Sequence, residues 1–181
     1  MAMFVFAYGS LIWRPGFAHL GARPALLRGY HRRFCIWSRH YRGTPERPGL
    51  VLGLDRGGAC QGVVFEVAAE AAAAVLEYLD ARENLLGEQV YHRRQLPVRL
   101  RGEGGYVVQA VTYVADRRHP AYARPGAETV AEAIAQAQGA AGSNRDYLLN
   151  TLDHLAGFGL RDAGLERIAR ALGGEQAAER H

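Results

Sequence analysis

The amino-terminal half of the chain contains four apolar, strand-like segments in succession before the first helical pattern. Gly, Pro and Asp residues separate these segments, which cover residues 3–8, 25–38, 49–54 and 61–67. A nucleotide-binding fold of the doubly wound type requires strands that alternate strictly with helices, and this alternation is missing. The order of the segments therefore favours an α+β domain.

The rest of the sequence adds one helix, two further strands and a helical last third. The helix is expected over 69–84, the strands over 89–100 and 105–115, and the terminal helices over 126–138, 144–159 and 161–172. The glycine-rich stretch 101–105 is typical of a hairpin connection. Ser143 or Asn144 is expected to cap the second terminal helix, and Gly157 or Gly159 to end it. We predict a mostly antiparallel or mixed sheet, curled into a small barrel with flanking helices.

The length and the hydrophobic content indicate one core. A chain of 181 residues, 49% of them hydrophobic, can bury roughly 70% of its unfolded surface. We expect a single domain over 1–175 and a flexible tail over 176–181. No apolar run approaches the roughly 20 residues of a membrane-spanning helix, and the amino terminus lacks signal-peptide features. We therefore expect a cytoplasmic protein without a membrane partner.

All 22 basic residues are arginines, and they are spread through the sequence among 18 acidic residues. A nucleic-acid-binding surface gathers its basic residues on one face or in one run, so we expect no nucleic-acid partner. The arginine-only, alanine-rich composition is typical of GC-rich coding and indicates a bacterial source. Without lysine, the chain cannot form a lysine Schiff base.

The cysteines and histidines form no metal-binding or nucleophilic pattern. Cys35 and Cys60 are too isolated for a disulfide framework, and no two of the seven histidines show zinc-ligand spacing. We expect no metal and no cofactor.

Residues 5–13, VFAYGSLIW, begin as a buried strand that breaks at Gly9 and Ser10. The stretch lacks the further glycines of a dinucleotide-binding motif and does not match the G-x-S-x-G nucleophile elbow. Gly9 permits close backbone approach, and successive N–H groups after a strand can bind a carboxylate or an oxyanion. The alternative interpretation is a tight turn with no further role.

Glu83 ends the first predicted helix, and Gly87 marks the loop that follows. A carboxylate near the negative end of a helix dipole has a raised pKa if it is also enclosed, which suits a general base. The alternative is a solvated glutamate paired with Arg82 or another arginine. Three of the nine tyrosines stand near apolar strand positions, where each belongs either to the core or to a pocket: Tyr8, Tyr91 and Tyr113.

Together these stretches resemble the ChaC-type γ-glutamylcyclotransferases, the branch of that superfamily associated with glutathione. Six matches occur in the family's order over nearly the whole chain: FAYGSLIWRPGF, GYHRRFCIWS, RGTPERPGLVLGL, EYLDAREN with VYHRRQLPVRL, VTYVADRRHPAYA and GAAGSNRDYLLNTLDHL. The segment RENLLGEQVY resembles the bacterial branch in its length.

The resemblance implies a role for particular residues. The family's Y-G-S-L turn holds the γ-glutamyl head, its R-E glutamate is essential, two tyrosines reach the substrate, and an arginine lies near the substrate carboxylates. The matching residues are Tyr8, Gly9, Ser10 and Leu11 in the turn, Glu83, Tyr91, Tyr113 and Arg42. His40 stands where family members tend to carry an acid, and this departure concerns the specificity for the tail of the substrate.

The resemblance also implies a reaction, in which glutathione is cyclised to 5-oxoproline with release of Cys-Gly. Glu83 would move the proton, Tyr113 or Tyr91 would donate a hydrogen bond, and no metal, nicotinamide or covalent enzyme intermediate is required. A Ser10 nucleophile is disfavoured because no motif places a histidine beside it. The alternatives are a cyclotransferase for another γ-glutamyl compound and a non-catalytic regulator linked to cation transport. The sequence does not indicate an oligomeric state.

Overall fold

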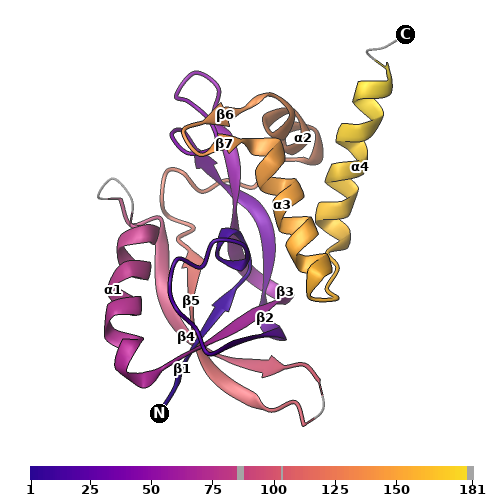
Figure 1. The fold of residues 1–181 in the computed structure, drawn as a ribbon. Coiled ribbons are helices and arrows are strands. Elements are labelled where there is room, and N and C mark those ends of the chain that lie inside the picture. Colours follow the sequence, from indigo (N-terminus) through magenta and orange to yellow (C-terminus); the bar gives the residue numbers. More distant parts are fainter. Residues whose placement is uncertain (85–87, 103, 179–181) are drawn as a thin grey trace.

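A closed five-stranded barrel forms the centre of the protein. The computed structural model describes residues 1–84, 88–102 and 104–178. The strands are β1 (Met3–Ala7), β2 (Gly21–Ser38), β3 (Gly49–Val67), β4 (Tyr91–Leu100) and β5 (Val107–Ala115). Their order is β1-β3-β2-β4-β5, and β5 closes the barrel by parallel pairing with β1. The other neighbours in this order pair antiparallel, so the predicted α+β fold with a barrel-shaped sheet is confirmed (Figure 1).

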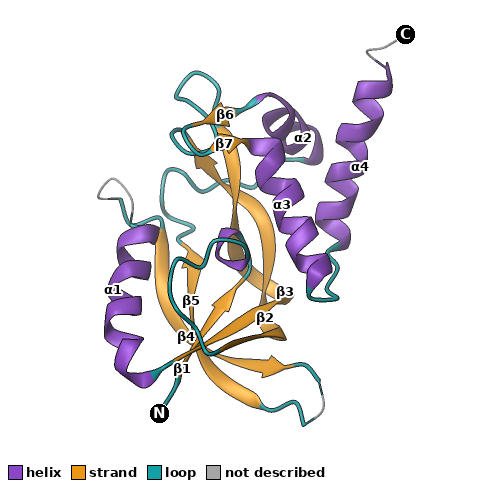
Figure 2. Cartoon of the chain, in the orientation of Figure 1, coloured by secondary structure: helices purple, strands orange, loops and turns teal. Residues whose placement is uncertain are grey.

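Strand β3 is continuous, whereas the sequence predicts two strands over 49–54 and 61–67. Gly57 and Gly58 lie between these segments and were interpreted as a break. Both have positive φ angles, 99° and 69°, which only glycine adopts readily, and they carry the chain through an irregularity in its pairing with β2. The prediction of two strands is therefore wrong, and β2 and β3 form one long, curved pair (Figure 2).

Four α-helices flank the barrel on two sides (Figure 1). Helix α1 (Ala72–Glu83) lies on one side, after the 3-10 turn η2 (Ala69–Ala71). On the other side lie α2 (Ala127–Gln136), α3 (Asn144–Gly157) and α4 (Ala163–Ala178), with a small hairpin, β6 (Gln138–Gly139) and β7 (Gly142–Ser143), that the sequence did not predict. No helix of the described ranges is long and apolar enough to cross a membrane.

Three predictions fall partly outside the described residues. Helix α4 reaches Ala178, so the first part of the predicted 176–181 tail is helical, and 179–181 lie outside. Gly87 and residue 103 of the predicted 101–105 connection are also outside. The hairpin itself is confirmed, because β4 and β5 pair antiparallel on either side of it.

Helix α3 begins and ends at the predicted residues. The Ser143 hydroxyl accepts the backbone N–H of Asp146 at 3.0 Å, which is the N-cap bond, and Gly159 follows the helix with a φ of 67°. Leu148 and Leu155 are fully buried and join the helix to the core of the barrel.

Asn144 fixes the start of α3 against the barrel. Its side chain is 0% exposed, and it forms two hydrogen bonds with the peptide groups of Leu50 in β3. The amide oxygen accepts the Leu50 N–H at 2.7 Å, and the amide nitrogen donates to the Leu50 carbonyl at 2.7 Å. One side chain therefore forms the backbone hydrogen bonds that a neighbouring strand would otherwise form with β3.

We expect Asn144→Ala to lower the free energy of unfolding by about 2 to 4 kcal/mol, because two buried backbone groups lose their partners. Urea denaturation measures the change. Asn150→Ala, on the same helix, is the matched control, because no hydrogen bond of the Asn150 side chain to a described residue exists. Equal stability of the two variants would contradict the docking role of Asn144.

Candidate active site

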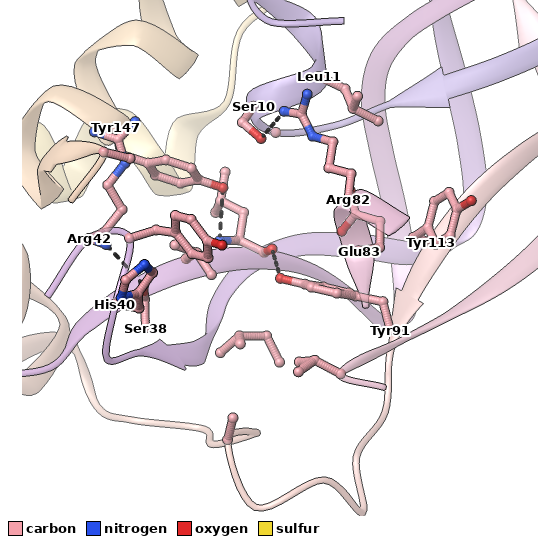
Figure 3. Close-up of a pocket in the computed structure, with 18 of the residues that line it drawn as sticks. Ser10, Leu11, Ser38, His40, Arg42, Arg82, Glu83, Tyr91, Tyr113 and Tyr147 are labelled. Atoms are coloured by element: carbon pink, nitrogen blue, oxygen red, sulfur yellow. Dashed lines mark hydrogen bonds between the residues drawn. The ribbon is translucent and has the colours of Figure 1, made fainter. Parts of the chain in front are cut away.

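A cavity of about 850 Å³ opens at one end of the barrel, between the end of α1 and the start of α3. Its size lies within the range of small-molecule sites. The residues that the sequence singled out as a site all line it: Tyr8, Gly9, Ser10, Leu11, Arg42, Glu83, Tyr91 and Tyr113. His40 lines it as well, with an exposed side chain. Segments that are distant in the sequence therefore form one site (Figure 3).

The turn after β1 forms one wall of the cavity. Its residues continue into the 3-10 turn η1 (Ser10–Ile12), and Arg32 of β2 holds the turn by donating through Nε to the Tyr8 carbonyl. A Cβ added to Gly9 would lie 3.2 Å from the Tyr147 hydroxyl oxygen. Glycine at this position therefore lets the backbone approach a polar group of α3 closely.

Glu83 is the last residue of α1, and it lines the cavity. Its side chain is partly buried and forms no hydrogen bond or salt bridge with any described residue. Burial raises the pKa of the Glu83 carboxyl to about 7, and the neighbouring Arg82 guanidinium opposes part of this rise. Such a carboxyl exchanges a proton near neutral pH.

Tyr91 of β4 and Tyr147 of α3 both bind the peptide groups of Leu52, but in opposite senses. The Tyr91 hydroxyl donates to the Leu52 carbonyl at 3.0 Å, whereas the Tyr147 hydroxyl accepts the Leu52 N–H at 3.2 Å (Figure 3). The phenol proton of Tyr91 is therefore in use. The phenol proton of Tyr147 has no acceptor among the described residues, so it can be donated to a ligand in the cavity.

The hydroxyl of Tyr113 also donates a hydrogen bond within the protein. It donates to Asp80 of α1 at 2.7 Å, and Arg93 of β4 forms a salt bridge with the same carboxylate at 2.5 Å. Figure 3 shows Tyr113 on the far side of Glu83 from Tyr147 and Arg42. Tyr113 thus lines the cavity with its ring, while its hydroxyl holds the helix that carries Glu83.

Arg42 brings a buried positive charge to the opposite side of the cavity. Its residue is 7% exposed, and its guanidinium donates to the Ser143 carbonyl at 3.0 Å and lies 5.3 Å from the centre of the Tyr147 ring. Within the described residues, no carboxylate lies at salt-bridge distance from it. Burial lowers the pKa of Arg42, and an anionic ligand would compensate the charge.

Two residues of the site were missed at the sequence level. Tyr147 occupies a buried position of the α3 helical pattern. A tyrosine that only fills the core would occupy the same position, so the sequence does not distinguish the two roles. Arg82 was considered only as one possible partner of Glu83 in the alternative interpretation, but its guanidinium donates to the Ser10 hydroxyl, the Arg14 carbonyl and the Tyr78 hydroxyl. In both cases the signal lies in hydrogen bonds to residues distant in the sequence.

Comparison with known proteins identifies the family. The sequence pattern of the ChaC-like proteins matches residues 3–174. The chain belongs to the ChaC-like family. Among ChaC-like relatives, it is 36% identical over 177 residues to the mouse "Glutathione-specific gamma-glutamylcyclotransferase 1", covering 95% of this chain and 78% of the mouse protein. It is 34% identical over 167 residues to the "Glutathione-specific gamma-glutamylcyclotransferase" of Escherichia coli, covering 92% and 71%.

A solved structure has the same fold as this ChaC-like chain. The crystal structure of a yeast γ-glutamyl cyclotransferase specific to glutathione superimposes with a TM-score of 0.86, covering 96% of both chains at 24% identity. The resemblance to the family that the sequence indicated is therefore confirmed, and so is the fold that it implied.

The raised pKa of Glu83 makes a prediction about stability. A carboxyl whose folded pKa is about 7, against an ordinary 4.5, stabilises the folded state below about pH 4.5, and this contribution is lost as the pH rises through 7. As the pH rises between these values, the free energy of unfolding of the wild type should fall by up to about 3 kcal/mol relative to that of Glu83→Gln, because the two pKa values differ by about 2.5. Urea denaturation at several pH values measures the difference. Glu77→Gln, an exposed position of the same helix, should show no such trend.

Proposed function

We propose that this chain is a γ-glutamylcyclotransferase that cleaves glutathione to 5-oxoproline and Cys-Gly. The observation that carries the proposal is a carboxyl of pKa about 7, unpaired among the described residues, in a cavity lined by the Tyr8 to Leu11 turn. The names of the mouse and E. coli relatives support glutathione as the substrate. The two buried free cysteines, Cys35 and Cys60, fit the reducing cytoplasm of a bacterium, where we place the enzyme.

In the proposed reaction the nucleophile belongs to the substrate. The α-amino nitrogen of the γ-glutamyl group attacks the γ-carbonyl carbon, a five-membered ring forms, and the γ-amide C–N bond breaks. Glu83 takes a proton from the substrate ammonium, so that the amine can attack, and the attacking nitrogen gives up a second proton as the ring forms. The leaving nitrogen gains one proton before the C–N bond breaks and a second as the free amine becomes an ammonium, so that protons balance over the cycle, with Glu83 as their carrier. A pKa near 7 suits both halves of this transfer. The enzyme's main contribution is to hold the chain folded against the base.

Glu83 and Arg42 lie in the cavity without an ion-pair partner among the described residues, and they fit the two ends of such a substrate. Glu83 attracts the α-ammonium, and Arg42 attracts a carboxylate. The first N–H groups of the turn that begins at Ser10 lack partners inside that turn, so they can bind a carboxylate or the developing oxyanion.

The hydrogen-bond donor to the reacting carbonyl is better assigned to α3 than to the strands. The sequence suggested Tyr113 or Tyr91, but these hydroxyls already donate to Asp80 and to the Leu52 carbonyl. The Tyr147 oxygen accepts the Leu52 N–H, and no described residue accepts its phenol proton. Burial raises the pKa of Tyr147 to about 12, so the phenol stays a donor at the pH of the reaction.

Incubation of the purified protein with glutathione, γ-Glu-Ala and γ-Glu-ε-Lys, without added metal, tests the proposal. We expect 5-oxoproline from glutathione, detected by chromatography. Product from another donor alone would keep the cyclisation and replace the substrate. Absence of product from all three would favour the regulatory alternative.

We expect Glu83→Gln to fold and to lose about 10³-fold in kcat/KM, because an amide cannot carry the proton. Steady-state assay of 5-oxoproline formation measures the loss, and Glu77→Gln serves as the control with the same change of charge on α1. A Glu83→Gln enzyme that kept most of its turnover would exclude Glu83 as the base.

A further inference from the structure

Helix α1 carries Glu83, but its apolar contacts with the barrel are few. Val75 and Leu79 are its only buried residues, and both lie before the last turn. Hydrophobic packing therefore fixes the body of the helix better than its end. The position of the Glu83 carboxylate depends on polar contacts of the last turn.

The guanidinium of Arg82 makes those contacts with the turn that follows β1. Nη2 donates to the Ser10 hydroxyl oxygen at 2.9 Å. Nη1 donates to the Arg14 carbonyl at 2.6 Å and to the Tyr78 hydroxyl oxygen at 2.9 Å. A single planar group thus joins two turns of α1 to the first residue of η1 and to Arg14, two residues beyond its end (Figure 3 shows the bond to Ser10).

The same two elements also meet through apolar contact. Tyr78 lies over Gly16, where an added Cβ would come within 2.0 Å of the phenol oxygen, and Gly16 has a φ of 73°. The Phe17 ring meets the Tyr78 ring edge to face, with centroids 6.4 Å apart. Residues 10–17 therefore follow the surface of α1, and Arg82 lies at the cavity end of this contact.

We infer that Arg82 is a positioning residue, which holds the Glu83 end of α1 against the substrate-binding turn and turns the Ser10 hydroxyl into a donor toward the cavity. The inference rests on the proposed cyclotransferase function and deepens it. Because the Ser10 oxygen accepts from a guanidinium, its own proton is directed elsewhere, and Ser10 lines the cavity. An acceptor on the substrate, such as a carboxylate or carbonyl oxygen, would receive it.

Arg82 also supplies the positive charge beside the base. Among the described residues, no carboxylate lies at salt-bridge distance from its guanidinium. The phenols of Tyr8, Tyr91, Tyr113 and Tyr147 also interact with the Glu83 charge, and their raised pKa values keep them neutral at physiological pH. Further charged or ionisable residues of the lining, among them Arg14, His40, Glu88 and His119, are unchanged in the variants below. Loss of the Arg82 charge therefore raises the pKa of Glu83, since this guanidinium lowers it.

Two variants separate the position of Arg82 from its charge. Arg82→Lys keeps the charge but cannot bridge the same set of acceptors, and Arg82→Gln loses both. We expect both variants to lower kcat/KM for glutathione by about 10- to 100-fold, the usual effect of losing hydrogen bonds to a charged group. The acid limb of the pH profile should move to higher pH in Arg82→Gln and stay in place in Arg82→Lys.

Arg161→Gln is the matched control, because Arg161 also loses a hydrogen-bonded pair, with Glu166, but does not line the cavity. It should behave as the wild type. Ser10→Ala, alone and combined with Arg82→Lys, completes a double-mutant cycle. If Arg82 acts through Ser10, the combined loss in kcat/KM is smaller than the product of the two single losses.

The outcomes distinguish this inference from the proposed function. A wild type that forms no 5-oxoproline contradicts the function itself. An active wild type with Arg82 variants as active as Arg161→Gln contradicts the inference, as does a multiplicative cycle with Ser10→Ala. If Arg82→Gln fails to fold in a thermal unfolding assay, Arg82→Lys and the cycle decide the matter without it.

Discussion

The site depends on one constraint, which is that the backbone groups at the outer edge of β3 near Leu50 and Leu52 need hydrogen-bond partners. In this part of β3, strand β2 pairs on one side, while β1 pairs farther along, with residues 63–67, and β5 meets β3 only at Leu54. Backbone groups that face away from β2 would be left without partners in the interior, which is costly. Three side chains supply the partners: Asn144 for Leu50, and Tyr147 and Tyr91 for Leu52.

These side-chain hydrogen bonds to β3 determine the position of the cavity as well as that of α3. A strand in that position would close the barrel along its full length, whereas side chains from α3 and β4 satisfy the same groups and leave space between them. The two tyrosines therefore have a structural task and line the cavity at once. Their hydrogen bonds with Leu52 also fix which of them keeps a proton to donate.

The sequence predicted much of this arrangement, because its signals are local. The strands follow apolar runs, Ser143 and Gly159 mark the ends of α3, and the end of α1 at Glu83 follows the helical pattern. The continuity of β3 was missed because two glycines look like a break, although their positive φ angles keep the chain within the sheet. The direction of each tyrosine hydrogen bond could not be predicted, since the partners, Leu52 and Asp80, lie 33 to 95 positions away along the chain.

The charges of the cavity explain why the free protein tolerates a half-buried glutamate. Burial, with no ion-pair partner among the described residues, gives the Glu83 carboxyl a pKa of about 7, so protonation limits the energetic cost of its charge. In the proposed reaction, a bound substrate brings an ammonium to Glu83 and a carboxylate to Arg42, and each group becomes the counter-ion that the protein leaves out. Binding then favours the ionised form of Glu83 in the complex, where this carboxylate must take up a proton. Under the proposed function, Glu83 and Arg42 would therefore select a ligand that carries both charges, because a ligand with only one of them would leave the other residue without a counter-ion.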